Sequence, residues 1–153
     1  MSLADDIGVL RRVPLFTDLT DEQLRLLAFS GERVAVAAGE TATAAGDPAT
    51  GAAVVLSGRL ALTPGAGFPG RPQHAGPAAL INAPGLVAAG VEPFTVVGEE
   101  ASELLVIRRP VFLRLLGEFP TVAARLHADL ARRLADFAGE AARLAAALDE
   151  DER

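Results

Sequence analysis

The sequence predicts a mainly β domain with helices at both ends, a β-roll of the jelly-roll or double-stranded β-helix type. Turn signals recur about every eight to ten residues through the middle of the chain, between short apolar runs. Both ends instead show the apolar spacing of helices. The length of 153 residues, half of them hydrophobic, suits one domain with a proper core. We expect residues 1–119 to hold N-terminal helices and the roll, and residues 120–153 to form a C-terminal dimerisation helix.

Two short helices are expected at the N-terminus. The first has apolar residues at helical spacing, namely Leu3, Ile7 and Leu10. It ends before Pro14, because the residue preceding a proline is pushed out of the helical region. Thr20 and Gln23 form a capping box that opens the second helix, which ends near Gly31. The inner face of that helix is expected to be Leu24, Leu27 and Ala28.

Strands are expected from Glu32 onward. Residues 63–73 contain three prolines and three glycines, which is typical of an exposed hairpin loop. Strand patterns return at residues 94–97 and 103–107. The region between Glu32 and residue 107 therefore holds the β-roll.

The pattern is helical after Pro110, and a long helix is expected to begin near Pro120, a residue that suits a first helical turn. Apolar residues then recur at alternating spacings of four and three, which is typical of a coiled-coil seam. The seam residues are Leu130, Leu134, Phe137, Ala141, Leu144 and Leu148. We expect a homodimer through this helix, and the alternative is a helix packed on its own roll.

Composition argues against several classes of function. The chain has no cysteine, which removes disulfides, thiolate metal sites and thiol nucleophiles. Its net charge of −6 and its lack of tryptophan and tyrosine argue against a nucleic-acid-binding surface. It shows neither a signal-peptide pattern nor a run of about 18 apolar residues. We expect a cytoplasmic protein without a nucleic-acid or membrane partner.

The order of these elements, and several short segments, resemble the cyclic-nucleotide-binding domain family, which includes CRP/FNR-like regulators and regulatory subunits of protein kinase A. The similar segments are residues 13–24, 39–47, 56–60 and 103–112. The resemblance spans about residues 9–137, and it implies the β-roll fold. Family members that regulate transcription carry a helix-turn-helix after the long helix. Only residues 149–153 follow the seam here, so we expect no DNA binding.

The resemblance also implies the position of a phosphate-binding cassette. In the family, a Gly-Glu pair opens a short helix, and an arginine precedes a strand with a small residue and a threonine. The equivalent positions in this chain are Asn82, Ala83, Pro84, Gly85, Leu86, Glu92, Pro93, Phe94 and Thr95. On this register Asn82 stands for the glycine, Ala83 for the glutamate and Glu92 for the arginine.

These departures weaken phosphate binding. Ala83 lacks the acceptor for the ribose hydroxyl, Pro84 removes an amide donor, and Glu92 reverses the charge that would face the phosphate. Phe94 replaces a small residue, and we expect it to narrow the pocket. Arg59 and Arg71 are expected in solvent. We therefore expect no cofactor and no usual binding of cyclic AMP or cyclic GMP.

No enzyme is predicted. His74 and His127 are too far apart in the pattern to share a metal, and the acidic runs are expected on solvated faces. Ser57 and Ser102 lack a nucleophile elbow and a histidine base. The main functional hypothesis is a stand-alone regulatory or interaction module. The alternative is a small-molecule sensor, in which a nucleotide-like ligand at residues 82–95 moves the terminal helix.

Overall fold

The computed structural model describes residues 2–120, 123–125, 127–129, 131–132 and 135. Their elements are α1 Leu3–Arg12, η1 Pro14–Phe16, α2 Asp21–Ser30, β1 Glu32–Val36, β2 Thr41–Thr43, β3 Gly51–Ser57, β4 Leu60–Pro64, β5 Gln73–Ala75, β6 Leu80–Ile81, η2 Ala83–Leu86, β7 Phe94–Gly98, β8 Ser102–Arg108 and α3 Arg109–Glu118. Pro120 and the described residues after it are also helical. The predicted seam residues Leu130, Leu134, Phe137, Ala141, Leu144 and Leu148 lie outside the described residues.

Both predicted N-terminal helices are confirmed. The hydroxyl of Thr20 accepts from the amide of Gln23, and the Gln23 side chain accepts from the amide of Thr20, which is the predicted capping box. Ser2 and Asp5 cap α1 in the same way. Reciprocal caps satisfy amide donors at the start of each helix, so the capping residues determine where both helices begin.

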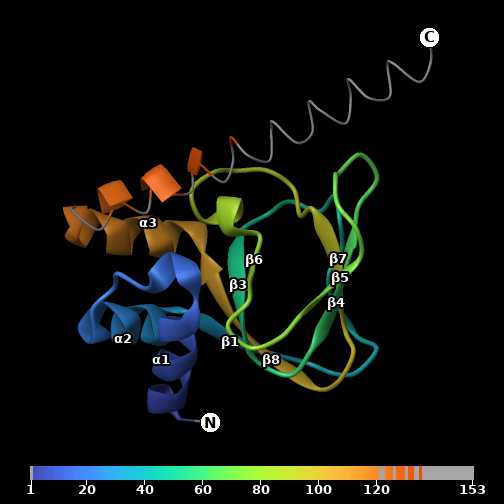
Figure 1. The fold of residues 1–153 in the computed structure, drawn as a ribbon, viewed down its shortest axis with the longest axis horizontal. Coiled ribbons are helices and arrows are strands. Elements are labelled where there is room, and N and C mark those ends of the chain that lie inside the picture. The colour runs from blue at the N-terminus through green and yellow to red at the C-terminus, as the bar shows by residue number, and fades with distance from the viewer. Residues whose placement is uncertain (1, 121–122, 126, 130, 133–134, 136–153) are drawn as a thin grey trace.

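The strands form two four-stranded antiparallel sheets, with the orders β1-β8-β3-β6 and β2-β7-β4-β5. Figure 1 shows the helices on one side of the first sheet and strands β4, β5 and β7 on its other side. The first sheet is therefore the shared wall between the helices and the interior of the roll. This architecture confirms the predicted β-roll.

Alternating side chains of the first sheet supply two separate cores. Val54 and Leu105 point to the helices, where they pack with Phe16 and Phe112. Their sequence neighbours Val55 and Leu104 point into the roll, where the second core continues through β4 and β7. Successive side chains of a strand face opposite sides, so one sheet can serve both cores.

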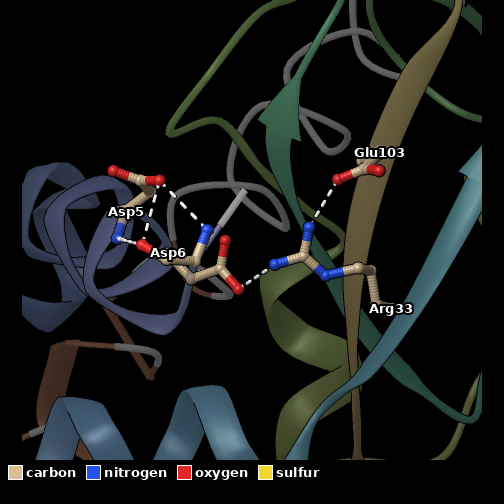
Figure 2. Close-up of polar contacts among 5 residues, drawn as sticks. Asp5, Asp6, Arg33 and Glu103 are labelled. Atoms are coloured by element: carbon tan, nitrogen blue, oxygen red, sulfur yellow. Dashed lines mark hydrogen bonds and ion pairs between the residues drawn. The ribbon is translucent and has the colours of Figure 1, made fainter.

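A charged cluster fastens α1 to the first sheet. Asp6 of α1 is 5% exposed and pairs with Arg33 of β1, whose guanidinium also donates to Glu103 of β8 at 2.5 Å. Figure 2 shows the guanidinium of Arg33 between the two carboxylates. The hydrogen bond from Arg33 to Asp6 is the main reason why the pKa of Arg33 is raised. The other carboxylate oxygen of Asp6 has no partner among the described residues.

Ser102 has a structural role at the turn between β3 and β4. Gly58 has a φ of +92°, and a Cβ there would lie 2.1 Å from the Ser102 hydroxyl. That hydroxyl accepts from the amide of Arg59 and donates to the carbonyl of Glu100 at 2.9 Å. The loop predicted at residues 63–73 is present, but β4 continues to Pro64 at its start.

Within the described part of the chain, we find no helix that is both long enough and apolar enough to cross a membrane.

Candidate functional site

The short helix η2 occupies the predicted cassette. Asn82, which precedes it, has a left-handed backbone with φ of 62°, and its side chain does not cap the helix. Pro84 lies in the first turn, where it supplies no amide donor. The amide of Gly85 is used within the turn, because it donates to the carbonyl of Asn82 at 3.0 Å. Two of the amides that would face an anion are thus absent or already bonded.

Gly85 lies against the backbone of β3. A Cβ at this position would come within 2.2 Å of the carbonyl oxygen of Gly51. Ala83 and Leu86, on either side of it, are buried in the core that faces the helices. Ala83, to which the resemblance assigns the position of the family's glutamate, therefore contributes to that core.

Arg109 links η2 to the start of α3. Its Nε donates to the carbonyl of Gly85 at 3.0 Å, and its Nη2 donates to the carbonyl of Ala49 at 2.7 Å. Its own amide donates to the carbonyl of Thr50 at 2.8 Å. One guanidinium thus fixes the relation between η2, the loop before β3 and α3. Sequence analysis did not single this residue out, although its place directly before Pro110 marks the first turn of a helix.

Glu92 is fixed by its backbone beside the loop between β2 and β3. Its amide donates to the carbonyl of Asp47 at 2.7 Å, and its carbonyl accepts from Gly46 at 2.8 Å. Asn82 Nδ2 lies 3.4 Å from the carboxylate oxygen Oε2. Partial burial is the main cause that raises the pKa of Glu92; the Asn82 hydrogen bond opposes this, and the charge of Asp47 adds to it.

A cavity of about 170 Å³ lies inside the roll beside this carboxylate. Its walls are mainly apolar and include Val34, Ile81, Val96 and Leu104. The threonines Thr43 and Thr50 also line it, and Glu92 is the single charged residue among the described residues of its wall. The site therefore combines an apolar chamber with one anionic group.

Pro93, Phe94 and Thr95 are not among the residues that line this cavity, so Phe94 does not narrow it directly. Phe94 packs against the core inside the roll, and the hydroxyl of Thr95 accepts from the amide of Ala45 at 3.1 Å. The carbonyl of Pro93 accepts from the amide of Gly65 at 2.9 Å. Asn82 and Glu92 are thus the two predicted residues whose polar side-chain groups the structure brings together. The contribution of Thr43 and Thr50 was not predicted, because it depends on which distant segments meet at the cavity.

The alternative candidates from the sequence lie on the surface. Arg59 and Arg71 are exposed, and Arg59 pairs with Glu99 at 2.9 Å. His74 pairs with the same glutamate, while His127 is exposed on the C-terminal helical segment. In the described ranges, no three histidine, aspartate or glutamate side chains gather as a metal site would require.

A larger groove of about 600 Å³ lies on the outside, beside Pro14 and Pro77. Arg12 and His74 border it. We nevertheless take the smaller roll cavity as the candidate site, because it includes Glu92 and is adjacent to η2.

The fold defines a class of protein, a β-roll domain with N-terminal helices and a helix that leaves the last strand. Three of the solved structures that are similar at a probability of 1.00 are at least 30% identical to this chain. A cyclic nucleotide-binding-like protein from Brucella abortus is 32% identical, with 74% of this chain and 98% of that chain covered and a TM-score of 0.63. The N-terminal domain of a transcriptional regulator from Streptomyces coelicolor is 33% identical, with coverages of 84% and 93% and a TM-score of 0.72. The catabolite activator protein of Thermus thermophilus is 30% identical, with coverages of 86% and 63% and a TM-score of 0.70.

The chain therefore belongs to the cyclic-nucleotide-binding domain family. No protein-family model and no curated protein sequence matches it. Membership in the family accounts for the fold.

Proposed function

We propose that this chain is a regulatory or interaction module that does not bind cyclic AMP or cyclic GMP in the usual way. The observation that carries the proposal is that Glu92 lines the roll cavity. On the register that the resemblance implies, Glu92 stands at the position of the family's phosphate-binding arginine. At an effective dielectric constant of 20, two like charges about 4 Å apart repel by about 4 kcal/mol. Solvent reduces this value, but the sign of the interaction opposes a phosphate.

The size of the cavity supports the same proposal. Sites for cofactors and drug-sized ligands enclose roughly 300–1,000 Å³, whereas this cavity holds about 170 Å³. Phe94 packs against the core that forms the cavity wall, where the family has a small residue. A cyclic nucleotide would have to displace wall side chains as well as approach a like charge.

The direct test is calorimetric titration of cyclic AMP and cyclic GMP into the wild type and a Glu92→Arg variant. Ala83 remains unchanged, because a glutamate in its place would enter the helix-facing core. We expect no binding by the wild type. Micromolar binding by the wild type would overturn the proposal. Binding by Glu92→Arg alone would assign the loss to the reversed charge, and silence in both proteins would assign it to the small cavity.

We further propose that the chain acts as a homodimer through its C-terminal helix. The heptad spacing from Leu130 to Leu148 supports this proposal. Sedimentation of the full chain at tens of micromolar should give the mass of a dimer, and Leu144→Asp should shift it toward the monomer. A monodisperse wild-type monomer would refute the dimer.

A second candidate function is a small-molecule sensor, and the contacts of Arg109 favour it. The residue holds the carbonyls of Gly85 and Ala49 while it forms the first turn of α3. A ligand that moved η2 would therefore act directly on the start of that helix. Hydrogen exchange of the α3 amides should change on ligand binding in the wild type and should change less in Arg109→Leu. Equal changes in both proteins would argue against this coupling.

A further inference from the structure

We propose that the roll cavity binds a small organic cation, with an apolar body of about six to eight non-hydrogen atoms in the chamber and an ammonium group on Glu92. This inference rests on the second candidate function, the sensor, and it names the chemical class of the ligand. A site for a phosphate favours an anion, whereas the proposed site favours a cation.

The volume sets the size of the ligand. A cavity of about 150 Å³ lined by apolar side chains is large enough to hold benzene. The roll cavity holds about 170 Å³, and Val34, Ile81, Val96 and Leu104 supply comparable walls. Thr50 lines the cavity and is exposed, so the chamber reaches solvent at that end. A single ring with a short polar arm fits this space.

The charges set the sign of the ligand. Among the described residues, Glu92 is the one charged residue in the cavity wall, and no arginine or histidine forms an ion pair with it. The neighbouring carboxylate of Asp47 adds negative potential. A cation that enters the chamber would meet the carboxylate of Glu92, and it would offset the desolvation that raises the pKa of Glu92.

The side chain of Asn82 makes a long contact with the carboxylate of Glu92. Its Nδ2 lies 3.4 Å from Glu92 Oε2 and 3.5 Å from the carbonyl of Gly51, so it spans from β3 to the segment before β7. These long contacts leave acceptor capacity on the carboxylate, because an ionised carboxylate has about four lone-pair sites. An ammonium group with three donors can use that capacity.

Benzylamine is the probe, and benzyl alcohol and benzoate are its neutral and anionic counterparts of similar shape. Each is titrated into the full chain, labelled with nitrogen-15 and observed by NMR. We expect saturable shifts at the amides of Val34, Val96 and Leu104 with benzylamine. Benzyl alcohol should bind at least about tenfold more weakly, because it cannot form the charge-assisted hydrogen bond. Benzoate should not bind, because its negative charge is repelled by the carboxylate of Glu92.

Two variants isolate the carboxylate. Glu92→Gln should weaken benzylamine about tenfold or more while leaving benzyl alcohol unchanged. Glu100→Gln, which removes an exposed acid outside this cavity, should leave both ligands unchanged. If Glu92→Gln failed to fold, the comparison of the three probes on the wild type would still decide the charge preference.

Three outcomes would overturn the inference: equal binding of benzylamine and benzyl alcohol, no shift with benzylamine, or full benzylamine affinity in Glu92→Gln. None of them affects the first proposed function, which the titration with cyclic nucleotides tests separately. If benzylamine binds but the hydrogen exchange of the α3 amides does not change, the sensor function is overturned, and the assignment of the cavity as a cation site stands.

Discussion

The guanidinium of Arg109 is bonded to the carbonyl oxygen of Gly85 at 3.0 Å, so a side chain of α3 closes over the backbone of η2. Gly85 is itself pressed against the Gly51 carbonyl. The cassette is therefore held between β3 on one side and the first turn of α3 on the other. The side chain of Arg109 would oppose a displacement of η2, and it would transmit such a displacement to the start of α3.

Replacing Arg109 with leucine should lower the free energy of unfolding by about 1.5–3 kcal/mol, because the carbonyls of Gly85 and Ala49 lose charge-assisted donors. Both of these residues are buried. Urea denaturation measures the change. The matched control is Arg108→Leu, whose exposed ion pair with Glu32 should cost less than about 1 kcal/mol. Equal losses in the two variants would contradict the assigned role.

Arg33→Met should destabilise the protein by about 2–4 kcal/mol, because it leaves the buried carboxylate of Asp6 without its cation. This loss of stability is smaller than for a fully buried ion pair, because the Arg33 side chain is 35% exposed. Adding Asp6→Asn should recover most of the loss. The pair Arg11 and Asp21 is exposed, so Arg11→Met should cost less than about 1 kcal/mol. A double-mutant cycle by urea denaturation without coupling would refute this role.

Glu92 should make stability depend on pH in a direction opposite to that of most acids. Its pKa is raised above the usual 4.5 mainly by burial, so the folded state holds the proton more tightly than the unfolded state. The unfolding free energy should therefore fall as the pH rises from 4.5 through the raised value.

Glu92→Gln should remove this dependence. The variant should have a higher melting temperature than the wild type at pH 7, and the difference should shrink as the pH approaches 4.5. Thermal unfolding across that range measures it, with Glu100→Gln as the control acid. A difference that stays constant with pH would show that the charge of Glu92 is not the cause.

Gly85→Ala should be destabilising by about 1–3 kcal/mol, because the added Cβ would overlap the Gly51 carbonyl at 2.2 Å and backbone cannot rotate away. It should also shift the NMR signals of residues around the cavity. Gly90→Ala is the matched control, since a Cβ there meets nothing within 4 Å. Comparable stability of the two variants by urea denaturation would contradict the close packing of η2.

Local patterns made much of the fold predictable. The capping box at Thr20 and the apolar runs around Val96 and Leu105 gave elements that the structure confirms within one or two residues. Such signals depend on neighbours in the chain, so one sequence is sufficient to read them. The capping box of Ser2 and Asp5 at the start of α1 was not predicted, although the same kind of signal is present there.

The site was less predictable, because its geometry depends on contacts between distant segments. Counting along the chain placed Asn82 and Glu92 in one cassette, and their side chains do meet. Counting could not show that Ala83 packs toward the helices or that Arg109 reaches Gly85. Both facts depend on how β3 and β8 pair and on where α3 begins.

Leu104 and Leu105 are consecutive residues of β8 that belong to different cores. Insertion or deletion of a single residue in this strand would send each leucine to the other's side and disturb both cores at once. The loop at residues 65–72 carries no such constraint, because it lies between strand ends and away from the shared wall. Changes in chain length should therefore be absorbed at that loop, which is the natural place to insert a tag or a reporter peptide.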